Sequence, residues 1–219
     1  VCGGHTEVTS EISRPIVNGT MLGLVDKNRL ITTLGGKPGD ALLLTHGIAI
    51  EGAAIICHEK QEELEKHLDS DLIDIGKNRL KDPGICIVKE AQLLASNFDI
   101  HAMHDPTEGG LAMGIVELAK NSNCGVILDL DAIPLISPTQ EICEIFQLNP
   151  MGLISSGCVL CAVDPQDVPS IQELMVQNHI PIYKIGNLTE IPEKYEIQQK
   201  NGEIRPLHYS EKDELTKIW

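Results

Sequence analysis

The chain has 219 residues, of which 42% are hydrophobic and 22% charged, and its formal net charge is −15. This length suits one full domain and part of another. The negative charge argues against a nucleic-acid surface, which needs clustered Lys and Arg. A membrane span needs about 18 apolar residues in a row, and a signal peptide needs a basic and then apolar start; the sequence has neither. We therefore expect a globular, cytoplasmic protein.

The first half of the chain predicts strands followed by helices. Residues 1–30 are rich in β-type residues without helical periodicity, which predicts two strands joined by a loop. A Pro-Gly-Asp turn precedes an apolar strand over 41–45, and a helix begins at about Glu51. A second helix is expected over 82–97, with Asp82-Pro83 in its first turn. Because the sequence opens on VCGG without Met, we also expect a fragment of a longer protein.

The second half alternates helices and strands. A helix follows DPTEGG, a strand lies in CGVILDLDAIPL, and SPTQEICEIFQL is a helix with Ser137 as its N-cap and Pro138 as its first residue. A strand in GCVLCAVD, a helix in PQDVPSIQELMVQNHI, a strand in PIYKIGNLTEIP and an Asn-Gly hairpin in YEIQQKNGEIRPL follow. This order predicts an α+β, or layered α/β, domain in which a mixed sheet packs against helices.

The seven cysteines are scattered, and their odd number favours reduced thiols over a disulfide framework. Cys158 and Cys161 form a C-x-x-C within a predicted strand, where a spacing of three places the two side chains on opposite faces. A zinc site needs a second pair of ligands, which the sequence lacks. We therefore expect two buried thiols, with metal binding by this pair, or by His101, His104 and Asp105, as the alternative.

The segment DPTEGGLAMGIVELA places an Asp-Pro turn and two glycines at the start of a helix. Free N–H groups and the positive end of the helix dipole suit an anion there, and glycines let it approach the backbone. The helix would bury four apolar residues: Leu111, Ile115, Leu118 and Ala119. Residues 107–110 would then lie at its exposed end. A phosphate-binding turn and a capped structural turn both remain open.

Three further segments could contact a ligand. Gly47 and Gly52 in THGIAIEG let the backbone pass close to a neighbouring group, which suits either contact with a ligand or packing within the protein. GLISSG offers two hydroxyls before a strand, for an oxyanion or as an ordinary polar turn. In GGHTEV, His5, Thr6 and Glu7 could bind Mg²⁺ or phosphate, or form a turn at a strand edge.

The order of four segments resembles the aminoimidazole ribonucleotide (AIR) synthase superfamily: GGHTEV, KPGDALLLTHGIAIEGAAIICHE, MHDPTEGGLAMGIVELA and NPMGLISSGCVLCAV. This superfamily includes the hydrogenase maturation carbamoyl dehydratase, selenophosphate synthetase and thiamin-monophosphate kinase. The resemblance extends over roughly residues 1–195 and is most specific in DPT-x-GGLA. It is strongest toward the hydrogenase maturation branch and toward AIR synthase-related proteins.

The resemblance implies that the chain is divided into three parts. Residues 1–33 resemble the end of an ATP-binding N-terminal domain, 34–195 the C-terminal domain, and 196–219 a hairpin and tail. ATP and Mg²⁺ are the implied cofactors, with most of their ligands in the N-terminal domain that this sequence lacks. The implied nucleotide and phosphate ligands are His5, Thr6, Glu7, Asp105, Thr107, Gly109, Gly110, Ser155, Ser156 and Gly157, and Glu7 is the candidate metal ligand.

The implied function is that of an ATP-dependent enzyme, seen here as its C-terminal portion. Such an enzyme phosphorylates a carbonyl or amide oxygen, or a small nucleophile, and the hydrogenase maturation branch makes that process the expected setting. The predicted partners are a small-molecule substrate and, for the full-length protein, a second copy in a homodimer, with neither nucleic acid nor membrane. The alternative is a non-catalytic domain that keeps the fold and senses phosphate or nucleotide, or binds a protein.

Overall fold

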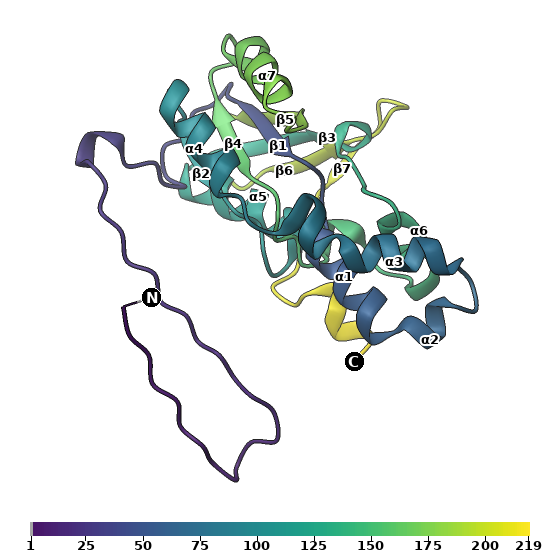
Figure 1. The fold of residues 1–219 in the computed structure, drawn as a ribbon. Helices are drawn as coiled ribbons and strands as arrows, with labels where there is room; N and C mark the ends of the chain where they lie inside the picture. Colours follow the sequence, from purple (N-terminus) through teal and green to yellow (C-terminus); the bar gives the residue numbers. More distant parts are fainter. Residues whose placement is uncertain (1) are drawn as a thin grey trace. The chain divides into compact units, whose positions relative to one another are not determined.

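The computed structural model describes residues 2–219, whose fold is shown in Figure 1. The chain divides into two compact units, Val1–Leu30 and Ile31–Trp219. Residues 2–30 have no regular secondary structure apart from a short 3-10 helix, η1 (Lys27–Arg29). The two strands predicted here are therefore wrong. A strand needs partners for its N–H and C=O groups, and no strand ladder forms within residues 2–30.

The second unit is built on one seven-stranded sheet with the order β2-β4-β1-β5-β3-β6-β7. Its strands are β1 (Ala41–Thr45), β2 (Ala102–His104), β3 (Gly125–Asp129), β4 (Leu160–Val163), β5 (Ile182–Thr189), β6 (Tyr195–Gln198) and β7 (Ile204–Pro206). Neighbouring strands pair antiparallel, except β3 and β6, which are parallel. The prediction of an α+β fold with a mixed sheet is confirmed.

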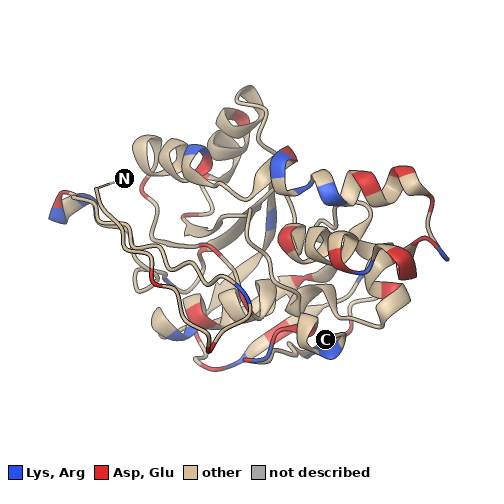
Figure 2. Ribbon diagram, turned by 60° about the horizontal axis from the view of Figure 1, so that its bottom comes forward, with Lys and Arg blue, Asp and Glu red and all other residues tan. Residues whose placement is uncertain are grey.

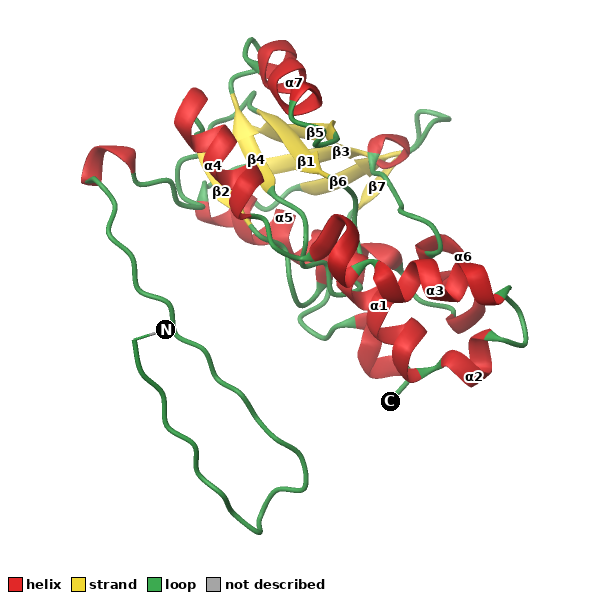
Figure 3. Ribbon diagram, viewed as in Figure 1, coloured by secondary structure: helices red, strands yellow, loops and turns green. Residues whose placement is uncertain are grey.

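Seven α-helices accompany the sheet in the described part of the chain. They are α1 (Ile50–Glu59), α2 (Gln61–Leu64), α3 (Ser70–Asn78), α4 (Val88–Asn97), α5 (Gly110–Asn121), α6 (Thr139–Phe146) and α7 (Val168–Gln177). Further helical turns are η2 (Leu80–Gly84), η3 (Leu130–Ala132), η4 (Pro150–Gly152) and η5 (Glu214–Lys217). Figure 3 shows α1, α2, α3 and α6 gathered beyond one end of the sheet.

Helices cover both faces of the sheet. All five residues of β1 are buried, as expected for a strand with packing on each side. Leu42 belongs to the same core cluster as Leu111 of α5, whereas Leu43 packs in a second cluster with Leu94 of α4 and Ile171 of α7. Side chains alternate along a strand, so these two clusters lie on opposite faces. Helix α5 therefore covers one face, and α4 and α7 cover the other.

The same alternation separates the two cysteines of the C-x-x-C. Cys158 belongs to the cluster on the α5 face and Cys161 to the cluster on the opposite face, and both are 0% exposed. Thiols that point to opposite sides of a sheet cannot share one metal ion. The prediction of two buried thiols is confirmed for this pair.

Two predicted helix starts are wrong, both at a proline. The helix expected from residue 82 begins at Val88, and Asp82 has an extended backbone (φ −137°, ψ 107°) within η2. The helix expected to begin at Pro138 begins at Thr139, with Pro138 itself as the N-cap and no side-chain cap from Ser137. Proline disfavours the α conformation in the residue before it, which agrees with the extended backbone of Asp82.

The C-terminal hairpin is confirmed and belongs to the main sheet. Strands β6 and β7 pair antiparallel around a turn in which Gly202 has a φ of 83°, and β6 also pairs with β3. Figure 2 shows Asp and Glu spread over helices and loops, with Lys and Arg interspersed among them. Among the helices of residues 2–219, none has both the length and the apolar character needed to cross a membrane.

Candidate functional site: the turn before helix α5

The turn before α5 is held together by hydrogen bonds to the carbonyl oxygen of Thr107. This oxygen accepts hydrogen bonds from the backbone N–H groups of Gly110 and Ser155, both at 3.1 Å. The DPTEGG and GLISSG segments, which lie far apart in the sequence, therefore meet at one atom. Two of the segments that the sequence analysis singled out form one structural unit.

The two glycines of this turn are required by backbone geometry and by space. Gly109 and Gly110 have φ angles of 75° and 65°, which L side chains rarely adopt. A Cβ atom on Gly110 would lie 2.5 Å from the carbonyl oxygen of Met151 and 2.8 Å from that of Leu153. Both glycines are buried, although the sequence predicted them at the exposed end of the helix. The prediction failed because η4 packs directly onto the turn.

The apolar stripe of α5 is confirmed: Leu111, Ile115, Leu118 and Ala119 are at most 1% exposed. The stripe packs on the sheet and fixes the direction of the helix. The start of α5 is therefore held by a rigid core.

Ser155 and Ser156 differ in what they can offer a ligand. The Ser155 hydroxyl is fully buried and accepts a hydrogen bond from the Ala49 N–H at 3.0 Å, at the residue that precedes α1. It therefore holds THGIAIEG against GLISSG. Ser156 is half-buried, so its hydroxyl can face a ligand. Gly157 (φ 106°) packs closely against the Gly84 carbonyl, where a Cβ would lie 2.7 Å away.

The glycines of THGIAIEG pack against neighbouring side chains. A Cβ on Gly47 would lie 2.8 Å from Ile136 Cγ1, and one on Gly52 would overlap the Leu153 side chain. Of the two alternatives left open by the sequence, packing explains both positions.

A carboxylate from the C-terminal segment already occupies part of the turn. The Gly109 N–H donates to Asp213 Oδ2 at 2.9 Å, while Asp213 Oδ1 accepts from the Leu215 N–H at 2.9 Å. A Cβ on Gly109 would also lie 2.9 Å from the Ser210 carbonyl oxygen. Asp213 was not predicted from the sequence, because its local pattern shows only the cap of a short helix and gives no sign of the distant Gly109.

Beside the turn lies a polar cavity of about 500 Å³. It is lined by His104, Asp105, Thr107, Glu108, Met113, Glu117 and Glu211. His104 Nε2 lies 2.7 Å from Glu117 Oε2, and His104 Nδ1 lies 4.0 Å from Asp105 Oδ1. The Asp105 side chain is 76% exposed. Glu117 was not predicted from the sequence, in which its only signal is a place on the polar side of α5.

The metal hypotheses find no support in the described residues. His101 Nδ1 lies 2.8 Å from the buried Asp40 carboxylate, and its Nε2 lies 3.1 Å from Lys37 Nζ, which makes it part of the KPGD turn. Within residues 2–219, no three His, Cys, Asp or Glu side chains converge to hold a metal ion. The proposed pairing of His101 with His104 and Asp105 is therefore wrong.

His5, Thr6 and Glu7 lie in the first unit and are exposed. His5 Nε2 is 3.0 Å from Glu7 Oε2, with side-chain exposures of 81% and 80%. An exposed pair of this kind does not form a Mg²⁺ site by itself. His5 and Glu7 alone do not fit the ion, and the role of Glu7 as a metal ligand stays a prediction.

The turn suits a phosphate group better than a metal ion. Its donors are the Ser156 and Thr107 hydroxyls and the Gly109 amide at the start of α5, where the helix dipole favours negative charge. The Thr107 hydroxyl donates to the Asp105 carbonyl at 3.0 Å and would have to rotate toward a ligand. The Gly109 amide becomes available only when Asp213 moves away. The donors therefore fit a phosphate once the C-terminal segment is displaced.

The two buried thiols of the C-x-x-C are held neutral. Burial raises the pKa of Cys158 to about 12, with the Asp105 charge adding to the effect and the Ser155 hydrogen bond opposing it. Burial alone raises the pKa of Cys161 to about 12. Neither thiol is a nucleophile or a metal ligand at neutral pH, since both roles need the thiolate.

These shifts predict a loss of stability in alkali. A raised folded-state pKa means that the native chain holds its thiol protons more tightly than the unfolded chain, so the stabilisation is complete below pH 9 and is lost as the pH rises toward 12. Between pH 8 and pH 10 we expect Cys161 to account for about 1 kcal/mol of the decrease. Urea unfolding of the wild type and of Cys161→Ala at both values measures it. An equal decrease in both proteins would contradict the prediction.

Comparisons with known proteins place the chain in a family. The model of the AIR synthase related protein C-terminal domain matches residues 37–197. A Methanocaldococcus jannaschii protein named for hydrogenase expression or formation is 30% identical over 172 residues, which are 78% of this chain and 48% of that protein. Carbamoyl dehydratase HypE of Cupriavidus necator is 26% identical over 202 residues, 91% of this chain and 54% of HypE.

A solved structure shares the fold. The hydrogenase maturation protein HypE in complex with ATP superimposes with a TM-score of 0.64 at 19% identity, covering 89% of this chain and 57% of HypE. The chain thus spans about half the length of the relatives that it matches. The family model covers most of the second unit, including the α5 turn and the GLISSG segment. The chain belongs to the AIR synthase related protein family, in which it matches the C-terminal domain.

Proposed function

We propose that this chain is the C-terminal part of an ATP-dependent enzyme that activates a carbonyl or amide oxygen, or a small nucleophile, by phosphorylation. We further propose that the full-length protein acts in hydrogenase maturation. Family membership supports the proposal, as do the relatives named for hydrogenase formation and carbamoyl dehydration. The observation that carries it is the bonding of Gly110 and Ser155 to the Thr107 carbonyl, which brings two segments of the family pattern into one turn.

In this proposal the chain supplies one wall of the site. The Gly109 amide, with the Thr107 and Ser156 hydroxyls, would stabilise the negative charge of a transferring phosphoryl group, while Gly110 shapes the turn through its bond to the Thr107 carbonyl. The exposed carboxylate of Asp105 lies at the adjoining cavity, where it can orient the group that receives the phosphate. Ser155 and Gly157 act by fixing the shape of this wall.

The remaining contacts are proposed to come from the rest of the full-length protein. ATP would supply the phosphoryl group, and most ATP and Mg²⁺ ligands would lie outside this chain. His5, Thr6 and Glu7 would contact the nucleotide. A small-molecule substrate and a homodimer of the full-length protein remain predictions. In this arrangement the 219-residue chain by itself is inactive.

The test is isothermal titration of the full-length protein with ATP and Mg²⁺, combined with phosphate release. We expect binding, and we expect Asp105→Asn to reduce phosphate release by about 100-fold, the usual scale for a group that orients a reacting partner. Asp99→Asn removes the same charge from a side chain that is 92% exposed and should leave the rate unchanged. Equal rates for the two variants would exclude the role of Asp105. Absence of ATP binding would contradict the enzyme.

One observation favours the second candidate, a non-catalytic domain that senses phosphate or nucleotide, or binds a protein. The Gly109 N–H donates a hydrogen bond to the Asp213 carboxylate, as it would to a permanent structural cap. Full-length protein that binds ATP but releases no phosphate with any substrate would support this candidate.

A further inference from the structure

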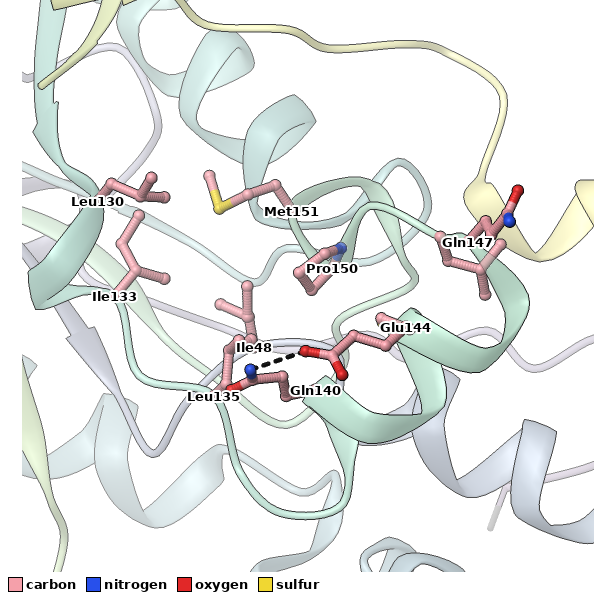
Figure 4. Close-up of a pocket in the computed structure, with 11 residues that line it drawn as sticks. Ile48, Leu130, Ile133, Leu135, Gln140, Glu144, Gln147, Pro150 and Met151 are labelled. Atoms are coloured by element: carbon pink, nitrogen blue, oxygen red, sulfur yellow. Dashed lines mark hydrogen bonds between the residues drawn. The ribbon is translucent and has the colours of Figure 1, made fainter. Parts of the chain in front are cut away.

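A separate apolar pocket of about 550 Å³ lies between η3, α6 and η4 (Figure 4). Ile48, Ile133 and Met151 are 1%, 8% and 6% exposed and form its buried wall, while Leu135 is 38% exposed at its edge. The volume is that of a pocket for a small organic molecule. The proposed function uses no part of this pocket.

The polar side chains of the pocket come from α6 and the residue that ends it. Gln140 Nε2 donates to Glu144 Oε1 at 2.9 Å, and Figure 4 shows the two side chains together on the side away from Leu130 and Met151. Both side chains are exposed, so the carboxylate lies at the open side of the pocket. Glu144 takes part in none of the ion pairs formed within residues 2–219.

Glu144 is the one ionised group among the 11 lining residues. The only other acidic group in the lining is the thiol of Cys143, which is 4% exposed. Burial raises the pKa of Cys143 to about 12, and the charges of Glu214 and Glu144 add to the effect. The thiol is therefore neutral and contributes apolar surface. The pocket combines an apolar wall with a single unpaired negative charge.

We propose that this pocket binds a small organic cation, with its ammonium group on the Glu144 carboxylate and its apolar body against Ile48, Ile133 and Met151. Burying the body removes apolar surface from water, and the ammonium supplies the missing counter-charge. An anionic molecule of the same shape is disfavoured by Glu144 and by the net charge of −15. A neutral molecule gains the apolar contacts only.

The test compares three probes with one apolar body: phenylbutylamine, phenylbutanol and phenylbutyrate. They are titrated into the 219-residue chain, and binding is followed by NMR of the side-chain methyl groups. We expect the amine to shift the methyl signals of Ile48, Leu135 and Met151, and to bind about three- to fivefold more tightly than the alcohol, the scale of a partly exposed charge pair. The carboxylate should bind most weakly.

Two variants separate the charge from the apolar wall. Glu144→Gln should remove the preference for the amine over the alcohol, while Glu141→Gln, on the same helix and outside the lining, should keep it. Leu135→Trp fills the edge of the pocket and should weaken both probes in a chain that keeps its circular dichroism spectrum. Equal affinity of wild type for amine and alcohol would overturn the proposal. The proposal would also be overturned if the methyl shifts were confined to other parts of the chain, or if the amine did not bind.

Discussion

A Gly110→Ala variant should lose about 3 to 4 kcal/mol of unfolding free energy. About 1 to 2 kcal/mol comes from forcing an L side chain to a φ of 65°. The rest comes from the new Cβ, which meets the carbonyl oxygens of Met151 and Leu153 in a packed region that cannot relax freely. Urea unfolding, followed by circular dichroism, measures the change.

Gly202→Ala is the matched control for this substitution. Gly202 also has a positive φ, 83°, but nothing lies within 4 Å of its would-be Cβ. It should therefore lose only the conformational part, about 1 kcal/mol. If both variants lost the same unfolding free energy, η4 would be free to move away from the turn. The close approach at Gly110 would then make no contribution to stability.

An Asp213→Ala variant should bind inorganic phosphate about tenfold more tightly than the wild type. The bond from the Gly109 N–H to the Asp213 carboxylate is charge-assisted, so a phosphate must first displace it, at a cost of roughly 1.5 kcal/mol. Isothermal titration of the 219-residue chain measures the gain. The same variant should lose about 1 kcal/mol of stability, because the cap of η5 at Leu215 is removed.

Glu211→Ala is the charge control. It removes the Glu211 carboxylate, which lies on the same segment as Asp213 but forms no hydrogen bond to the turn. A purely long-range charge effect would therefore change the phosphate affinity of both variants alike. If neither wild type nor Asp213→Ala binds phosphate, the turn is a capped structural element. In that case this chain would have no part in the phosphate chemistry proposed for the full-length protein.

The elements that could be predicted are those set by local periodicity. The strand over 41–45 was predicted with its observed bounds, because four apolar residues and Thr45 lie between turn signals. The buried stripe of α5 and the opposed cysteines followed from helical and strand periods, which hold wherever the element packs against one core. These features depend on neighbours within one element.

The features that could not be predicted depend on contacts between distant segments. The sequence shows good hydroxyl ligands at both Ser155 and Ser156, yet only the fold buries the first against Ala49 and leaves the second accessible. It shows two glycines at a helix start, and gives no sign that Asp213 caps one of them. Turn residues are alike in composition whether a ligand or the chain itself satisfies their amides. The sequence alone therefore could not decide between the two alternatives at the turn.

The carbonyl oxygen of Thr107 has two lone pairs, and both are used, by Gly110 and by Ser155. Neither donor can leave without exposing an acceptor in a crowded region. Any rearrangement on ligand binding therefore has to carry the start of α5 and the Ser155 loop together, as one rigid block. Flexibility for closing over a substrate must come from hinges outside this block, and substitutions at those hinges would change the rate of closure without changing the shape of the wall.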